Sequence, residues 1–143
     1  NKPSYPDKLS KKLKNKFQSG VYGLDMYRTI AQSKIVLNIH ADTSFKYASN
    51  MRLFETTGVG TCLLTDWKSN VTNFFSDETE IVTYRSADEC VEKTVWLLEN
   101  ETQRLNIAKN GQRRTLTDHT IEKRVALIDK IIKKTYKNIY KIK

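Results

Sequence analysis

A glutamate on a predicted short helix is the first residue in this sequence that suggests chemistry. It is Glu55, in the segment NMRLFETTGVGTCLLTD from Asn50 to Asp66. Residues recur at three-position spacing, which predicts a helix whose packed face consists of Met51, Phe54 and Thr57. Asn50, Arg52 and Glu55 lie off that face. The carboxylate can bind the hydroxyl groups of a ligand or pair with Arg52 on a solvated surface, and both interpretations stay open here.

A turn and a strand follow this helix. Gly58 and Gly60 tolerate positive φ, so they predict a helix stop and a tight entry into the next element. The apolar run from Thr61 to Thr65 predicts a short strand that is covered on both faces. The unit therefore predicts a helix, a glycine turn and an interior strand.

The rest of the chain alternates in the same way. We expect a helix over residues 23–34, a strand over Ile35 to Ile39 and a third strand over Glu80 to Tyr84. A capping box from Ser86 to Glu89 begins the next helix, and a further helix starts at residue 100 or 101 and ends near residue 117. Such alternation predicts the α/β class, with a Rossmann-like parallel sheet of about three to four strands and helices on both faces. The predicted parts are a polar, lysine-rich lead segment (1–19), a partial nucleotide-sugar-binding domain (20–119) and a basic amphipathic helix (120–143).

Polar residues follow the first predicted strand at the end where ligands bind. Open α/β sheets bind ligands outside the carboxyl ends of their strands, which makes His40 and Asp42 candidate ligand contacts. We expect Ser49 or Asn50 to cap the next helix and to leave its N–H groups available for a diphosphate, with Arg52 adding positive charge. The alternative is that His40 and Asp42 form an ordinary solvated turn.

The net charge of +9 belongs to the two ends of the chain. Residues 1–16 carry +5 and residues 123–143 carry +7, which leaves −3 for residues 17–122. No zinc-finger, RNA-recognition or helix-turn-helix motif accompanies these basic ends, so we expect no specific nucleic-acid partner.

The last segment predicts an amphipathic helix. Its apolar residues recur three or four positions apart, at Ile121, Val125, Ile128, Ile132, Tyr136 and Ile139. Lysines occupy the other sides, and Thr120 is the expected N-cap. One interpretation is that the stripe packs on this domain or on a partner domain. The other is that the helix lies on an anionic membrane surface.

The sequence contains no apolar stretch of the roughly 18 residues that span a membrane and no apolar segment of a signal peptide. We therefore expect a cytoplasmic protein, with the inner face of the membrane as the place where the basic helix would attach it. The two cysteines, Cys62 and Cys90, are expected to be reduced thiols.

Four blocks of the sequence also resemble a known family. They read SKIVLNIH, NMRLFETTGVGTCLLTD, EIVTYRSADECVEKTVWLLEN and RLNIAKNGQRRTLTDHTIEKRV. In this order they resemble the C-terminal donor-binding part of GT-B glycosyltransferases, in particular the CgeB-like (spore maturation type) branch of group 1. The resemblance covers roughly residues 22–128.

The resemblance implies a nucleotide-diphosphate-sugar as the donor substrate. We expect no metal, because the sequence shows no cluster of Asp, Glu or His at a ligand spacing, and no other cofactor. It assigns Glu55 to the ribose hydroxyls, and two acceptor oxygens suit a diol. Many relatives carry a second glutamate eight positions earlier, where this sequence has Tyr47. Donor activation would come from electrostatic stabilisation of the leaving diphosphate.

The resemblance also implies that other parts of such an enzyme, including the N-terminal acceptor-binding region, lie outside this sequence. We therefore expect a donor-binding portion of a glycosyltransferase that is inactive alone, with an open sheet edge that favours a homo-oligomer. The alternative is a non-catalytic α/β module that serves assembly or membrane attachment through its basic helix. The sequence does not choose the base, the sugar, the acceptor or the stereochemical outcome.

Overall fold

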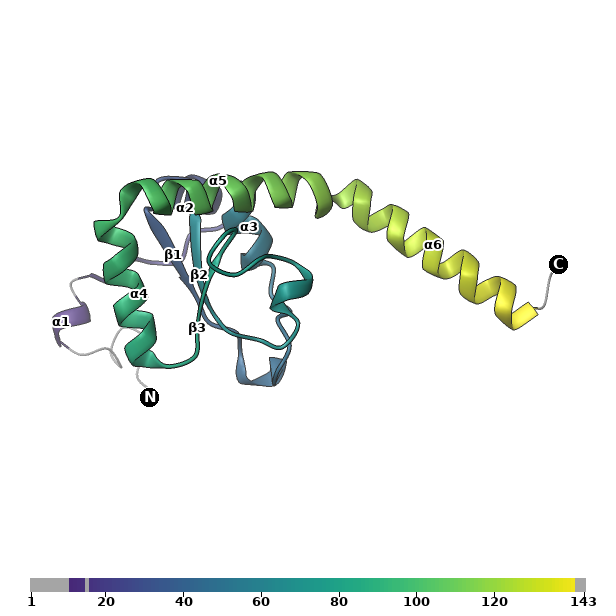
Figure 1. Ribbon diagram of the computed structural model, residues 1–143, viewed down its shortest axis with the longest axis horizontal. Helices are drawn as coiled ribbons and strands as arrows, with labels where there is room; N and C mark the ends of the chain where they lie inside the picture. The colour runs from purple at the N-terminus through teal and green to yellow at the C-terminus, as the bar shows by residue number, and fades with distance from the viewer. Residues whose placement is uncertain (1–10, 15, 141–143) are drawn as a thin grey trace.

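The computed structural model describes residues 11–14 and 16–140, which form an α/β fold followed by a long helix (Figure 1). The strands are β1 (Ile35–Asn38), β2 (Cys62–Asp66) and β3 (Val82–Tyr84). The α-helices are α1 (Lys11–Lys14), α2 (Gly23–Ala31), α3 (Arg52–Gly58), α4 (Ala87–Glu99), α5 (Glu101–Asp118) and α6 (Ile121–Tyr140). Two short 3-10 turns complete the described elements, η2 (Asp42–Ser44) and η3 (Val71–Asn73).

The three strands form a parallel sheet in the order β1-β2-β3. Val36 pairs with Leu63 on one side of the central strand, and Val82 pairs with Leu64 on the other. Every residue of β2 from Cys62 to Thr65 is buried. A strand covered on both faces is a nearly continuous run of small and branched residues, as this one is. The predicted Rossmann-like α/β class and the predicted interior strand are therefore confirmed.

The sheet separates two apolar cores. On one face, Cys62 and Leu64 pack with Leu97 of α4 and Ile107 of α5. On the other face the core gathers around Leu63, and its other members are Ala48, Leu53, Val71, Phe75 and Ile81. Successive side chains of a strand point to opposite faces, which is why Leu63 and Leu64 belong to different cores. Figure 1 shows α4 over one face and α5 crossing the edge at which the strands begin.

Helix α3 ends as the sequence predicts but packs through a face that only partly matches the predicted one. It stops at Gly58, and Gly60 has φ +81°, a conformation that suits glycine. The buried side chains are Leu53, Thr56 and Thr57, whereas Met51 is 66% exposed. The predicted packed face is therefore right in part: Thr57 is buried and Phe54 packs against the core, but Met51 is exposed. The reason is that α5 and β2 both contact α3 and together select the side of it that is buried.

Helix α5 lies close against α3 because small residues meet there. The hydroxyl groups of Thr57 and Thr115 are 2.6 Å apart, and Gly111 lies against the backbone of Glu80. At its other end, buried Arg104 donates to the carbonyl oxygen of Leu97 over 2.7 Å. This arrangement satisfies one of the free carbonyl groups at the end of α4.

Helix α4 begins with most of the predicted capping box. The backbone N–H of Glu89 donates to the hydroxyl oxygen of Ser86 over 3.1 Å. The Glu89 carboxylate accepts from the backbone N–H of Arg85, one residue before the N-cap that a standard box would use. Hydrogen bonds from Lys93 and Arg85 hold the pKa of Glu89 below its usual value.

Strand β1 is an edge strand with apolar side chains in solvent. Leu37 is 53% exposed, and Ile39 just after the strand is 68% exposed. Helix α2 is shorter than predicted and covers little, since Ile30 is its only buried residue. An edge strand of this kind offers unpaired backbone groups to another chain.

Both cysteines are free thiols in the structure, as predicted. Cys62 lies in the core beside β1 and β3, and burial raises the pKa of its thiol to about 11. A thiol of this kind stays protonated and is a poor nucleophile at neutral pH.

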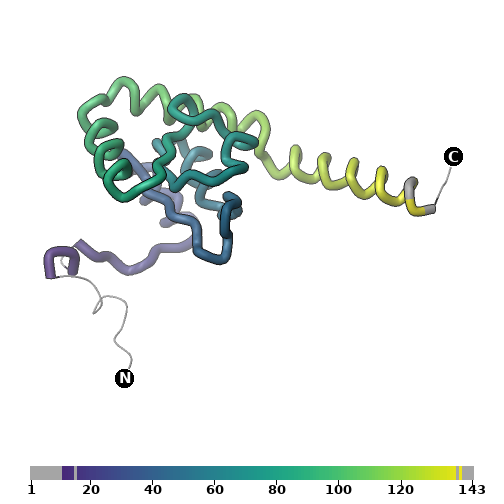
Figure 2. Tube along the Cα trace, turned by 60° about the horizontal axis from the view of Figure 1, so that its bottom comes forward, coloured from purple at the N-terminus to yellow at the C-terminus, as the bar shows by residue number. Residues whose placement is uncertain are grey.

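The junction of α5 and α6, at His119 to Arg124, contacts α3 through aromatic side chains. The centre of the His119 ring lies 5.1 Å from the centre of the Phe54 ring and 5.3 Å from the centre of the Phe75 ring. The Arg124 guanidinium stacks 5.2 Å from the centre of the Phe54 ring and lies 3.2 Å from Nδ1 of His119. Beyond this junction α6 projects away from the domain, as Figures 1 and 2 show. No helix in the described residues is both long and apolar enough to cross a membrane.

Candidate functional site

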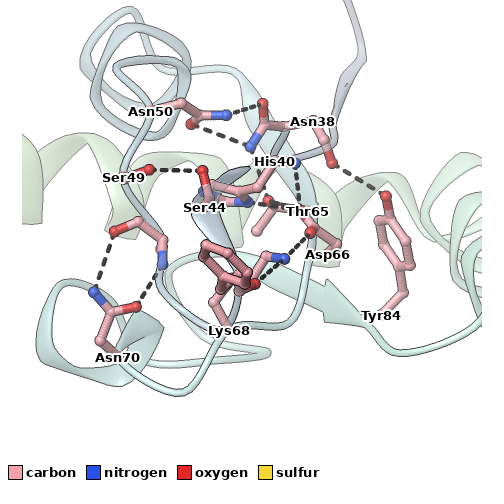
Figure 3. Close-up of polar contacts among 12 residues, drawn as sticks. Asn38, His40, Ser44, Ser49, Asn50, Thr65, Asp66, Lys68, Asn70 and Tyr84 are labelled. Carbon is pink, nitrogen blue, oxygen red and sulfur yellow. Dashed lines mark hydrogen bonds and ion pairs between the residues drawn. The ribbon is translucent and has the colours of Figure 1, made fainter. Parts of the chain in front are cut away.

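Polar side chains gather where the three strands end (Figure 3). Asn38 ends β1, Asp66 ends β2 and Tyr84 ends β3. The Tyr84 hydroxyl donates to the backbone carbonyl oxygen of Asn38 over 3.1 Å, so it bridges the two outer strands. The carboxyl ends of parallel strands are where open α/β sheets bind ligands. The carboxyl end of the sheet is therefore the candidate site.

Asn38 and Asn50 tie the end of β1 to the start of α3. The Asn50 amide donates to Asn38 Oδ1 over 2.9 Å, and Asn38 Nδ2 donates to Asn50 Oδ1 over 3.3 Å. Asn38 Nδ2 also donates to the Thr65 hydroxyl over 2.9 Å. A buried amide needs such partners, because an unmade bond costs about 1 to 3 kcal/mol. The pair therefore fixes the first turn of α3 at the edge where the strands end.

This pairing corrects the predicted helix cap. The N-cap of α3 is Met51, and no side chain caps the helix. The Asn50 amide is engaged with Asn38, and the Ser49 hydroxyl lies 2.9 Å from the Ser44 hydroxyl. The prediction that Ser49 or Asn50 caps the helix is therefore wrong, because both side chains have partners outside it.

His40 and Asp66 form a buried pair at the same edge. One carboxylate oxygen of Asp66 accepts from the His40 backbone N–H over 3.0 Å and lies 2.7 Å from Nδ1 of the ring. The other oxygen lies 3.1 Å from Lys68 Nζ. The His40 side chain is fully buried. His40 therefore does not lie in a solvated turn, which was the alternative that the sequence left open.

The charge state of Asp66 determines which nitrogen of the His40 ring carries the hydrogen. Burial alone would raise the pKa of Asp66, but hydrogen bonds from His40 and Lys68 outweigh it and hold that pKa below its usual value. Asp66 is therefore a carboxylate at neutral pH, and His40 Nδ1 must carry the hydrogen that they share. The other ring nitrogen, Nε2, is buried and has no hydrogen-bond partner among the described residues.

A loop from residue 41 to residue 50 folds over this pair. Lys68 donates to the carbonyl oxygen of Phe45 over 2.9 Å, and Asn70 exchanges two hydrogen bonds with the backbone of Ala48. Phe45 has φ +46°, a strained value for a residue with a side chain. Asp42 lies in this loop and is exposed. The loop is thus held in place by hydrogen bonds to the segment that follows β2.

Glu55 lies in the first turn of α3, and its carboxylate is mostly buried. Its side chain is 19% exposed and lies 3.3 Å from Arg52 Nη1. The ion pair that the sequence left open is thus formed. Arg52 also borders a hollow of about 340 Å³ together with residues 18–21 and side chains of α2. Pockets for small ligands begin at about 300 Å³, so this hollow can take part of a nucleotide.

The structure therefore gathers some predicted site residues and separates others. Asn50 and His40 join the network at the end of the sheet, and Ser49 lies in the loop beside it. Arg52 and Glu55 form their own pair within the first turn of α3.

Sequence reasoning missed part of this network. The missed residues are Asn38, Asp66, Lys68 and Tyr84. A usable signal was present, because three of the four are the last residues of strands. Ligands bind where such strands end, so that rule points to these three positions.

Tyr84→Phe tests the bridge between the outer strands. Burial raises the pKa of Tyr84 to about 12, and the Asp66 charge adds to this, so the phenol keeps its proton and donates to Asn38. We expect the change to lower the free energy of unfolding by about 1 kcal/mol. Urea denaturation followed by circular dichroism measures this difference. Tyr47→Phe on the exposed loop is the control and should cost nothing; equal losses would contradict the bridge.

Comparison with known proteins gives one finding. The model of a family described as glycosyl transferase-like matches residues 3–130. That match includes the three strands, the polar network at their ends and the first half of α6. Neither the curated proteins nor the solved structures gave a match.

Proposed function

The chain belongs to the glycosyl transferase-like family, and we propose that it binds the nucleotide-diphosphate-sugar donor of a sugar transfer reaction. The proposal includes the GT-B architecture and the CgeB-like branch that the sequence resembles. The observation that carries it is the position of Glu55 on a helix whose start is bound to the end of β1 through Asn38 and Asn50.

In this proposal Glu55 binds the ribose of the donor. Its side chain is 19% exposed, so part of it is open to a ligand without unfolding of α3. Its present partner is a single arginine at 3.3 Å, an ion pair of about 0.2 to 0.5 kcal/mol between neighbouring turns. Hydrogen bonds from a ribose diol to a carboxylate contribute about 1.5 to 3 kcal/mol each. A ribose can therefore replace Arg52 as the partner of Glu55.

Arg52, once released, is placed to meet the diphosphate. It borders the hollow of about 340 Å³, and guanidinium groups bind phosphate oxygens in pairs. We assign supporting positions near the donor to Asn50, Ser49, His40 and Asp42. We further propose that the acceptor is bound by another region, because three strands are half of the six in a full nucleotide-binding domain. The chain alone should then bind donor without transferring sugar.

Titration with nucleoside diphosphates tests the proposal. We expect UDP, GDP, ADP or TDP to bind weakly, and Glu55→Ala to weaken that binding about tenfold or more, since one charge-assisted bond is lost. Isothermal titration calorimetry measures both affinities.

The matched control is Glu99→Ala, which removes the same charge from an exposed position at the end of α4. It should leave the affinity unchanged. If none of the four diphosphates binds at millimolar concentration, or if Glu99→Ala and Glu55→Ala weaken binding equally, Glu55 does not form a ribose site.

A second candidate is a non-catalytic assembly module. The exposed side chains of Leu37 and Ile39 on the edge strand favour it, because such edges pair with other chains. The same titration separates the two candidates, since an assembly module should bind no nucleoside diphosphate.

A further inference from the structure

Helix α6 has a wide apolar face whose side chains are exposed to solvent. At 100° per residue, Ile121, Ile128 and Ile132 lie close to one line along the helix. The neighbouring residues extend this face to about half of the circumference. Each of its apolar side chains is at least 50% exposed: Ile121, Val125, Leu127, Ile128, Ile131, Ile132, Tyr136 and Ile139. Exposed apolar surface of this extent marks an interaction site.

Lysines fill the opposite face. Between Ile121 and Tyr140 the helix carries six basic and two acidic side chains, a net charge of +4. Lys134 and Lys123 lie at one margin of the polar face, next to the apolar one. The other margin holds Glu122 and Asp129, with Lys133 2.8 Å from Asp129. Lysines at such margins can extend their ammonium groups toward a surface while the apolar side chains enter it.

The position of α6 in the molecule leaves both faces accessible. The helix contacts the domain near its start, where Arg124 lies over the rings of Phe54 and Phe74. Past this point it projects from the body (Figures 1 and 2). Twenty residues of helix are about 30 Å long, which is enough to lie along a surface over several turns.

We propose that α6 is a membrane-surface helix that binds bilayers containing anionic lipid. An anionic surface matches both faces at once, because the acyl boundary receives the apolar side chains and the headgroups attract the lysines. A second copy of α6 would cover the apolar face as well, but it would bring two helices of +4 together. The charge of α6 therefore favours lipid over a second copy.

Co-sedimentation of the full chain with vesicles tests this. The probes are vesicles of phosphatidylcholine alone and vesicles that also contain phosphatidylglycerol, each at low and at high salt. We expect binding to the anionic vesicles that weakens with salt, and little binding to phosphatidylcholine alone.

Two pairs of substitutions separate the faces. Lys123→Gln with Lys134→Gln should weaken binding about 25-fold, at roughly fivefold for each lysine near an anionic surface. Ile128→Ser with Ile132→Ser should weaken it roughly tenfold or more for each residue. All four side chains are exposed, so the fold should persist, and circular dichroism checks this.

The matched controls remove two lysines or two apolar side chains from other parts of the chain. Lys11→Gln with Lys12→Gln takes two charges from the other basic end of the chain. Leu105→Ser with Leu116→Ser takes two exposed leucines, at 58% and 60% exposure, from α5. Both control pairs should bind anionic vesicles nearly as well as the unaltered chain.

Three results would overturn the proposal. The first is no sedimentation with anionic vesicles at low salt. The second is binding that the Lys11 and Lys12 pair weakens as much as the α6 lysine pair, which would indicate general attraction by net charge. The third is a dimer in light scattering that Ile128→Ser with Ile132→Ser dissolves, without lipid binding, which would identify a second copy as the occupant.

Discussion

Replacing Gly111 with alanine is expected to lower the free energy of unfolding by about 3 kcal/mol. Gly111 is buried in α5 where that helix passes the backbone just before β3. A Cβ at this position collides with the carbonyl oxygen of Glu80 and lies 3.3 Å from Cγ2 of Thr57. A backbone carbonyl cannot rotate away as a side chain can, so α5 must shift from both the sheet and α3. Urea denaturation should show a lower midpoint with an unchanged slope.

Gly58→Ala is the matched control for this change. Its added methyl group meets only Cγ2 of Thr115, at an ordinary contact distance of 3.6 Å. Gly58 is the last residue of α3, and alanine is favoured over glycine in a helix by up to about 1 kcal/mol. The control should therefore be as stable as the unaltered chain or more stable. Equal midpoints for the two variants would mean that α5 does not approach Glu80 this closely.

Asp66→Leu is expected to lower the free energy of unfolding by about 2 to 4 kcal/mol at neutral pH. The leucine would leave the backbone N–H and the ring N–H of His40 without their acceptor in a fully buried position. It would also remove the carboxylate that lies 3.1 Å from Lys68 Nζ. Asp42→Leu is the control, because it makes the same chemical change at an exposed position. A loss of stability no larger than that of the control would show that the pair contributes little.

The same carboxylate predicts how stability depends on pH. Its pKa in the folded chain is below the value of 3.8 for an unperturbed aspartate. The unfolded chain then binds a proton more readily than the folded chain in acid. The stabilising contribution is therefore complete above roughly pH 5 and is lost as the pH falls through the folded pKa. Asp66→Asn lacks this contribution, so its difference from the unaltered chain should be constant near neutrality and shrink in acid; a constant difference down to pH 3 would contradict it.

The sequence predicts the elements well because their signals are local. The interior strand β2 is a continuous apolar run, and α5 lies within one or two residues of its predicted bounds. The positive φ of Gly60, just after the end of α3, follows from glycine alone. These features need no knowledge of distant parts of the chain.

The errors arise where distant segments decide the outcome. Thr56 lies off the predicted packed face of α3, yet it is buried because α5 and β2 both contact this helix. The His40 and Asp66 pair joins residues 26 positions apart, and the Asn38 and Asn50 pair joins residues 12 apart. Periodicity within one helix or strand contains no information on such pairs. The candidate site could therefore be located at the sheet edge from the sequence, but its network could not.

The aromatic contacts at the junction of α5 and α6 link the position of α6 to that of α3. Phe54 precedes Glu55 on α3, and its ring contacts both His119 and Arg124 at the junction of α5 and α6. A rotation of α3 at its glutamate therefore cannot occur without repacking this junction. Over the length of α6, a small angular change at the junction becomes a large displacement at the far end. The contacts that set the direction of α6 thus involve the residue next to the proposed nucleotide contact.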